Sequence, residues 1–249
     1  MRQGRRAPCG HEANRWRRGG CGADWRDPGR ESGGRVRALG PLAARVCTMN
    51  RRLGVLISGR GSNLQAIIDA VAAGRLLATI AVVIANTADA GGLARARRAG
   101  IETVVLEHTA YPSREAYDQA LVAELRRRDV RLVCLAGFMR LLSGTFVEAF
   151  PNRILNIHPS LLPAFAGLHG QDQAWRHGVK IAGATVHVVT PELDAGPIVL
   201  QAAVPVEDAD TAETLAERIL AEEHRIYPAA IGIMLDGGWR IEGRRFLRR

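Results

Sequence analysis

The sequence predicts an α/β fold, a Rossmann-like and mostly parallel sheet with helices on both faces and antiparallel strands at one edge. From residue 53 onwards, short apolar runs alternate with segments whose apolar residues recur at helical spacing. The apolar runs are nearly continuous, which is typical of parallel strands buried on both faces. Two later runs joined by a turn sequence predict the antiparallel strands. The sequence shows no internal repeat and no transmembrane span.

The predicted elements follow in a regular order. Short, mainly aliphatic runs predict strands at residues 53–57, 79–85, 103–106, 132–136, 154–157, 183–190 and 198–206. Apolar residues at helical spacing, with a cap or a glycine stop, predict helices at 63–73, 91–99, 113–128, 143–150 and 211–235. Gly100 closes the second of these helices, and Ser113 is expected to cap the third with Ala116 at its third position.

The positive charge of the chain is concentrated at its front end. Residues 1–48 contain 11 Arg and 4 acidic residues, a net +7, so only +2 of the total +9 remains for residues 49–249. The folded part therefore offers no general field for phosphates, and we expect no nucleic-acid partner. Residues 1–48 contain almost no aliphatic residue before Val36, so we expect a disordered basic extension that is dispensable or precedes the true start at Met49. Residues 49–240 are expected to form one domain, followed by a basic tail at 241–249.

The four cysteines indicate a reducing compartment. Cys9, Cys21 and Cys47 lie in or beside the basic segment, and Cys134 lies in an apolar strand. This spacing is typical of neither a metal cluster nor a disulfide framework. We therefore expect no metal. Because no apolar segment is long enough for a secretory signal, we also expect a cytoplasmic protein with no membrane partner.

Three polar side chains near predicted strand ends suggest a site of proton transfer. Asn156 and His158 are two residues apart in a strand, so they face the same side of the sheet. Asp194 lies in a turn sequence after the next strand. A histidine beside a carboxylate can transfer protons near neutral pH. On the residues alone, a single Asn or His of this kind is more often a satisfied structural group.

A glycine-containing loop, 58–63, connects the first strand to the first helix. Its backbone N–H groups and the helix N-terminus can hold an anion, although such a loop is about as often only a tight turn. It lacks the lysine of a triphosphate loop and the third glycine of a dinucleotide fingerprint. Asn86 is also a poor substitute for the acid that binds a dinucleotide ribose. We therefore expect one phosphate of a small substrate at Gly61, Ser62 and Asn63.

Four separate motifs, in order, resemble those of the phosphoribosylglycinamide formyltransferases. They are the Gly-Ser-Asn loop, Phe138-Met-Arg-Leu-Leu142, Asn156-Ile-His-Pro-Ser-Leu-Leu-Pro163, and the run from Gly183 to Pro197 that ends in Glu-Leu-Asp-Ala-Gly-Pro. The likeness covers about residues 52–238. It implies the formyltransferase fold, with residues 49–240 as the catalytic domain.

The resemblance implies formyl transfer from 10-formyltetrahydrofolate to the amine of glycinamide ribonucleotide in purine synthesis. His158 would be the general acid, Asn156 would hold the formyl oxygen, and Asp194 would orient His158 and favour its protonated form. Gly61, Ser62 and Asn63 would bind the ribonucleotide phosphate, and Glu223 its glycinamide or ribose part. The folate would be bound by Arg114, Met139, Arg140, Leu141, Leu142, Asn156, Thr190, Pro191, Glu192, Leu193 and Asp194. Both substrates are small molecules, and the protein would be a monomer or a homodimer.

These residue types also suit the chemistry. The amine attacks the formyl carbon, and the charge that builds on its oxygen is stabilised by Asn156 and by protonated His158. A water or His158 can then carry a proton to the leaving folate nitrogen. If the amine attacks directly, neither a nucleophilic side chain nor a metal is needed.

Without the resemblance, several of these residues have plainer interpretations. Cys134 and His187 are expected to be structural, Met139 and Leu142 to be core, and Arg114 to begin a solvated helix face. Glu223 and His224 would be ordinary surface residues. Residues 164–175 are expected to form a mobile loop. In that loop Gly170-Gln171-Asp172 replaces the Thr-His-Arg often found in the family, so contacts of this loop with substrate do not carry over.

Three other functions remain open from the sequence. Formyltetrahydrofolate hydrolases resemble this chain but have an added regulatory domain in front and lack the phosphate loop. Methionyl-tRNA formyltransferases carry a further nucleic-acid-binding domain after the catalytic one. A nucleotide-sensing α/β module would use the arginine-rich front end to bind RNA.

Overall fold

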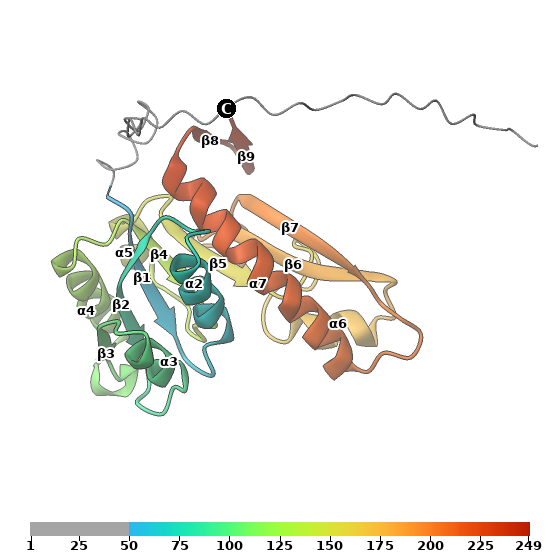
Figure 1. The fold of residues 1–249 in the computed structure, drawn as a ribbon, viewed down its shortest axis with the longest axis horizontal. Coiled ribbons are helices and arrows are strands. Elements are labelled where there is room, and N and C mark those ends of the chain that lie inside the picture. The colour runs from blue at the N-terminus through green and yellow to red at the C-terminus, as the bar shows by residue number, and fades with distance from the viewer. Residues whose placement is uncertain (1–49) are drawn as a thin grey trace, which may run out of the picture. The chain divides into compact units, whose positions relative to one another are not determined.

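The computed structural model describes residues 50–249, and the expected basic extension at residues 1–48 lies outside them. The described residues form one sheet flanked by helices (Figure 1). The strands are β1 (Arg52–Ile57), β2 (Thr79–Ala85), β3 (Thr103–Val105), β4 (Leu132–Leu135), β5 (Ile154–His158), β6 (Ile181–Val188), β7 (Ile198–Pro205), β8 (Trp239–Glu242) and β9 (Arg245–Arg248). The helices are α2 (Ser62–Ala72), α3 (Gly92–Arg98), α4 (Arg114–Arg127), α5 (Gly144–Ala149), α6 (Gly170–Arg176) and α7 (Ala212–Asp236), with a 3-10 turn, η1, at His108–Ala110.

The strand order is β3-β2-β1-β4-β5-β6-β7-β9-β8. Strands β1 to β5 run parallel, and β6 pairs antiparallel with both β5 and β7. The expected α/β fold, a mostly parallel sheet with antiparallel strands towards one edge, is thus confirmed. Each predicted strand and helix is present, with ends within two residues of those expected.

Alternation along the strands produces two apolar cores. In β1, Val55 and Ile57 pack on one side of the sheet with Leu64 of α2, whereas Leu56 packs on the other side with Leu121 of α4. Because successive side chains of a strand point to opposite faces, a continuous apolar run fills both cores. Helices α2, α3 and α7 thereby cover one face, and α4 and α5 the other (Figure 1).

Helix α7 ties the parallel and antiparallel parts of the sheet together. It packs against α2, α6, β6 and β7. The hydroxyl of its fully buried Tyr227 lies 2.9 Å from the Leu135 carbonyl of β4 and 3.1 Å from the Leu155 carbonyl of β5, and shares its one hydrogen between them. Buried hydroxyls need such partners, so the helix is held in one register over the two strands.

Two segments differ from expectation. Residues 164–175 are not a loop throughout, because α6 begins at Gly170 and buries Ala174. Residues 241–249, expected as a basic tail, belong to the hairpin β8–β9, which pairs with β7 and packs Trp239, Ile241 and Phe246 against the main core. Burial of these alternating apolar residues makes the segment part of the folded unit, so the boundary expected at residue 240 falls inside β8.

Candidate active site

The carboxyl ends of β1, β4 and β5 meet at one edge of the sheet because these strands are parallel neighbours. The loops that follow β1 and β4 are joined directly. The Ser58 N–H donates to the Gly137 carbonyl (3.1 Å), and the Met139 N–H donates to the Ser58 hydroxyl (2.8 Å). Ligands of open α/β sheets bind at this edge. The two loops predicted to bind the ribonucleotide and the folate are therefore contiguous.

The register between β5 and β6 determines which side chains share a face with Asn156. Asn156 lies directly opposite His187, and His158 lies opposite Thr185. Side chains of directly opposed residues point to the same face. Accordingly, the Asn156 Nδ2 and His187 Nε2 atoms are 3.2 Å apart. His187, expected to be structural, is a neighbour of the predicted catalytic amide.

Asp194 lies between the two imidazoles. Its carboxylate oxygens are 3.5 Å from His158 Nδ1 and 3.6 Å from His187 Nε2. The Gly167 N–H donates to it at 2.8 Å. The backbone of Asp194 is left-handed, with φ 48°, a conformation that Asp tolerates better than most residues. The side chains of Asn156, His187, Asp194 and His158 thus form one connected series, which brings the three predicted catalytic residues together.

The environment favours the ionised form of Asp194. Burial raises the pKa of its carboxyl, but the nearby His187 imidazole, the Gly167 N–H and the attraction of His158 together outweigh burial, so the pKa is lowered. The other ring nitrogen of His158, Nε2, lies 2.9 Å from the Phe165 carbonyl. A carbonyl only accepts, so His158 Nε2 carries the hydrogen in this contact. Only the protonated ring can also donate from Nδ1 to Asp194.

Gly170, the first residue of α6, lies close against His158. A Cβ atom at this position would lie 3.1 Å from the Phe165 carbonyl oxygen and 3.2 Å from His158 Nε2. Both distances are shorter than ordinary van der Waals contact, so glycine lets α6 begin against the histidine without displacing it. In the sequence, Gly170 is the only sign of this close approach.

The residues expected at the ribonucleotide site come from two helices. Gly61, with φ 71°, is the N-cap of α2 and is followed by Ser62 and Asn63. The Asn63 amide donates to Glu223 of α7 at 2.6 Å. Glu223 is 7% exposed, so the plain interpretation as a surface residue is wrong for it. Burial raises the pKa of Glu223, and the hydrogen bond from Asn63 only partly opposes this.

The residues expected to bind folate lie in four places: the start of α4, the 139–142 segment, Asn156 of β5 and the 190–194 loop. Met139 and Leu141 are 65% and 60% exposed in the loop after β4, so Met139 is not a core residue. Leu142 and Val189 are both partly buried against the same apolar cluster, so the 138–142 segment and the start of the 190–194 loop border one core. Arg140 lies over the Tyr117 ring of α4, 5.5 Å from its centroid.

Among the remaining folate candidates, Arg114, Pro191, Glu192 and Leu193 are exposed, and Thr190 is partly exposed. In the 190–194 loop, Thr190, Pro191, Glu192 and Leu193 precede Asp194, and Leu193 is 57% exposed. Arg114 begins α4, where its guanidinium lies 3.5 Å from Glu115. The contacts described for Arg114 are with its own helix and not with the residues around His158.

Two features of residues 50–249 bear on other kinds of site. In this part of the chain, no group of three or more His, Cys, Asp or Glu side chains is placed to hold a metal ion. None of its helices combines the length and apolarity that crossing a bilayer requires.

Comparison with known proteins gives consistent matches. The formyl transferase family model matches residues 51–231. The phosphoribosylglycinamide formyltransferase of Escherichia coli (strain K12) is 51% identical over 183 residues, which are 74% of this chain and 86% of that protein. That of Bacillus subtilis (strain 168) is 40% identical over 74% of this chain and 95% of its own length.

Solved structures and longer relatives agree. The crystal structure of glycinamide ribonucleotide transformylase 1 from Symbiobacterium toebii has a TM-score of 0.77 and 61% identity, over 78% of this chain and 92% of that one. The trifunctional purine biosynthetic protein adenosine-3 of Bos taurus is 48% identical over 190 residues, and the match spans only 19% of its length. Given the family match across residues 51–231 and these identities over most of two bacterial relatives, the chain belongs to the formyl transferase family and, within it, to the phosphoribosylglycinamide formyltransferases.

Proposed function

We propose that this protein transfers the formyl group of 10-formyltetrahydrofolate to the amine of glycinamide ribonucleotide in purine biosynthesis. The observation that carries the proposal is the connected series of Asn156, His187, Asp194 and His158 at the carboxyl edge of the sheet. Membership of the phosphoribosylglycinamide formyltransferases supports the choice of substrates.

The first step is attack of the substrate amine on the formyl carbon, which places negative charge on the formyl oxygen. The Asn156 amide donates a hydrogen bond to that oxygen, and protonated His158 donates from Nε2 once the formyl oxygen has replaced the Phe165 carbonyl as its acceptor. Ionised Asp194 favours the imidazolium form of His158 by direct attraction, and a low pKa keeps this carboxylate charged at neutral pH.

The second step is collapse of the tetrahedral intermediate. The attacking nitrogen loses a proton, the folate nitrogen gains one, and the bond between the formyl carbon and that nitrogen breaks. His158 or a water carries the proton. Holding both substrates in line supplies much of the acceleration, because a two-substrate reaction becomes effectively unimolecular.

We assign the ribonucleotide to the α2–α7 side of the edge, with Gly61, Ser62 and Asn63 at its phosphate and Glu223 at its glycinamide or ribose part. The amide hydrogens of the first turn of α2 and the absence of acidic residues from that turn favour an anion there. We assign the folate to Arg114, the 139–142 segment, Asn156 and the 190–194 loop. The exposed Met139, Leu141 and Leu193 supply apolar surface that a flat ring can cover.

We further propose that residues 49–249 form the catalytic unit and that both substrates are handled by a monomer or homodimer in the cytoplasm, without a metal. The extension at residues 1–48 is dispensable for the reaction.

The experiment that tests the proposal is an assay of purified protein with 10-formyltetrahydrofolate, in the presence and absence of glycinamide ribonucleotide. We expect tetrahydrofolate to appear only when the ribonucleotide amine is present. Release at the same rate without the amine would instead identify a formyltetrahydrofolate hydrolase.

A further inference from the structure

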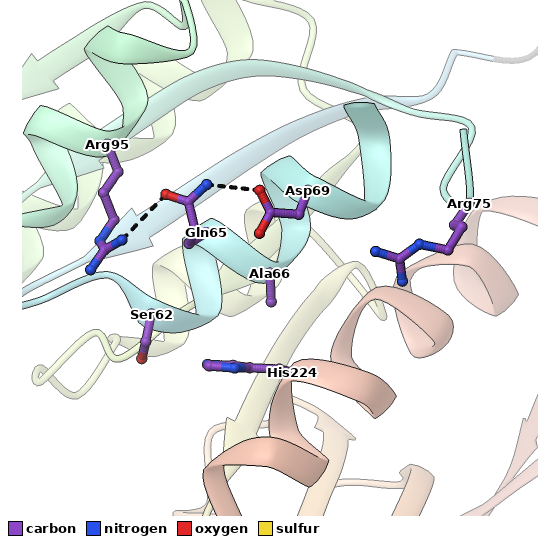
Figure 2. A pocket seen from close by; sticks show the side chains of 7 residues that line it. All are labelled: Ser62, Gln65, Ala66, Asp69, Arg75, Arg95 and His224. Atoms are coloured by element: carbon purple, nitrogen blue, oxygen red, sulfur yellow. Dashed lines mark hydrogen bonds between the residues drawn. The ribbon is translucent and has the colours of Figure 1, made fainter. Parts of the chain in front are cut away.

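A cavity of about 380 Å³ opens beside the proposed phosphate loop, between α2, α3 and α7 (Figure 2). It is lined by Ser62, Gln65, Ala66, Asp69, Arg75, Arg95 and His224. Ser62 is a proposed phosphate-binding residue, and the next residue along α7 from His224 is Glu223. The cavity therefore continues the proposed ribonucleotide site, and its other residues have no role so far.

Arg95 is held in place by two hydrogen bonds. Its Nε donates to the Arg60 carbonyl of the phosphate loop (2.9 Å), and Nη1 donates to the Gln65 side chain of α2 (3.3 Å). A guanidinium has five N–H donors, so others remain for a ligand. Figure 2 shows Arg95 and Ser62 towards the same end of the cavity.

The loop and the start of α3 form one packed unit. The Gly92 N–H donates to the Gly59 carbonyl (3.0 Å), and a Cβ added at Gly61 would lie 2.6 Å from the Gly92 Cα. The same Cβ would lie 3.6 Å from the Arg95 Cδ. Since no side chain fits between the loop and α3, the position of Arg95 relative to the loop is fixed by backbone packing.

A phosphate monoester carries a charge that backbone amides and the Ser62 hydroxyl do not neutralise. Two other arginines could supply it. The loop's own Arg60 is exposed and does not line the cavity. Arg75 lines the cavity but lies beyond the far end of α2, which at 1.5 Å per residue is roughly 15 Å from Ser62.

The field of Arg95 already acts within the cavity. Burial lowers the pKa of the His224 imidazole, the Arg95 guanidinium lowers it further, and Asp69 opposes them. His224 Nε2 is buried and has no hydrogen-bond partner among the described residues. A ligand oxygen in the cavity would provide that partner.

We propose that Arg95 supplies the positive charge that binds the phosphate of the ribonucleotide, so that the site selects a phosphorylated substrate over its riboside. The inference rests on the proposed function. Arg95 acts by binding and by holding the loop, and takes no part in the chemistry at the formyl carbon.

The test combines the Arg95→Gln variant with removal of the phosphate from the substrate. Formyl transfer is measured with glycinamide ribonucleotide and with the dephosphorylated riboside. For the ribonucleotide, we expect KM to rise roughly 10- to 100-fold, the range for losing a charge-assisted hydrogen bond, with kcat little changed. For the riboside, we expect KM and kcat to equal those of the wild type.

Two further variants isolate the effect. Arg98→Gln removes a cation from the exposed side of the same helix and should leave both substrates unaffected. Arg95→Lys keeps the charge but loses the paired hydrogen bonds of the guanidinium, so its KM for the ribonucleotide should lie between those of the wild type and Arg95→Gln. If Arg95→Gln fails to fold, Arg95→Lys compared with Arg98→Lys provides the same comparison.

Equal losses for ribonucleotide and riboside would show that Arg95 only braces the loop, and would overturn the proposal. A phosphate-specific loss in Arg60→Gln but not in Arg95→Gln would assign the role to Arg60 instead. Failure of the proposed function looks different, because the wild type would then transfer no formyl group. In that case calorimetric titration with ribose 5-phosphate still decides, as Arg95→Gln should weaken its binding and Arg98→Gln should not.

Discussion

At the residue scale, Asp194 is the residue on which the others depend. It contacts both imidazoles and accepts the Gly167 N–H, and these interactions keep it ionised despite its burial. An amide of the same shape could still accept a hydrogen bond. It would have no charge with which to stabilise an imidazolium.

Asp194→Asn should therefore lower kcat by roughly 100-fold or more, within the range that general acid–base groups contribute. Thermal unfolding should show that the fold persists. The matched control is Asp208→Asn, an exposed carboxylate paired with Lys180 at the surface, which should retain wild-type turnover. Near-normal kcat in Asp194→Asn would exclude the assigned role.

His187 contacts both Asn156 and Asp194, so its loss should affect the amide and the carboxylate together. We expect His187→Leu to lower kcat by roughly 10- to 100-fold, as small displacements of catalytic groups do. The nearby His187 imidazole lowers the pKa of Asp194, so removing the ring should raise that pKa. The acid limb of the kcat–pH profile should then move to higher pH. An unmoved acid limb would show that His187 has only a structural role.

Strand alternation was enough to place Asn156 and His158 on one face of the sheet, because residues two apart share a face whatever the rest of the sheet does. His187 could not be found in the same way. Its place beside Asn156 depends on the register of two antiparallel strands, which the sequence alone leaves open. The contact of Glu223 with Asn63 joins helices 160 residues apart, so its burial was not readable from local pattern.

At the scale of elements, helix α7 contains Glu223, a proposed substrate-binding carboxylate whose burial lowers the stability of the folded protein at neutral pH. Glu223 is buried against α2 and its pKa is raised, mainly by burial. The folded protein therefore binds a proton at a pH where the unfolded chain has already lost it. Stability from this group is complete below the unfolded pKa and is lost as pH rises through the folded pKa.

Glu223→Gln should thus be more stable than the wild type at pH 8, and the difference in the free energy of unfolding should shrink towards pH 5. Gln can still accept from Asn63, so packing is preserved. Urea unfolding at the two pH values measures this. The neighbouring Glu222→Gln, which removes the partner of Arg225 at the surface, should show no such trend. If Glu223→Gln were less stable than the wild type at pH 8, burial of the ionised carboxylate would not be destabilising as inferred.

Because Glu223 is a proposed ribonucleotide-binding residue, KM for the ribonucleotide should rise in Glu223→Gln.

Two buried tyrosines give a matched test of how α7 is attached. Tyr227 donates to carbonyls of β4 and β5, whereas the Tyr117 hydroxyl is buried with no partner among the described residues. Tyr227→Phe should lower the free energy of unfolding by about 1–3 kcal/mol, because two buried carbonyls lose a donor. Tyr117→Phe should be neutral or stabilising in the same denaturant titration. Equal effects would mean that the Tyr227 hydrogen bonds contribute nothing.

Most elements were predictable from apolar runs and helical spacing, but α6 and the β8–β9 hairpin were not. Helix α6 has only seven residues and follows His169 in a left-handed conformation, so no cap signal precedes it. In the 239–248 hairpin, four arginines and one glutamate interrupt the apolar residues. Its apolar residues become a buried face through the pairing of β9 with β7, which local sequence does not reveal.

At the scale of the whole molecule, most of the net positive charge and the proposed catalytic residues lie in different parts of the chain. Residues 1–48 hold a net +7, while the residues proposed for the site lie between Gly61 and Glu223. Removing residues 1–48 should therefore leave kcat and both KM values of formyl transfer unchanged. An RNA-binding module would instead lose RNA retention on a filter after this truncation. A loss of formyl transfer would contradict the assigned independence of the extension.

The central claim is direct attack of the substrate amine on the folate-bound formyl carbon, aided by His158 and Asp194. A single-turnover experiment with a labelled formyl donor, quenched at intervals, follows that carbon from donor to product. We expect the label to pass to formylglycinamide ribonucleotide as the donor disappears, with none on the protein and none as formate. Label bound to the protein at early times, or released as formate regardless of the amine, would contradict direct transfer.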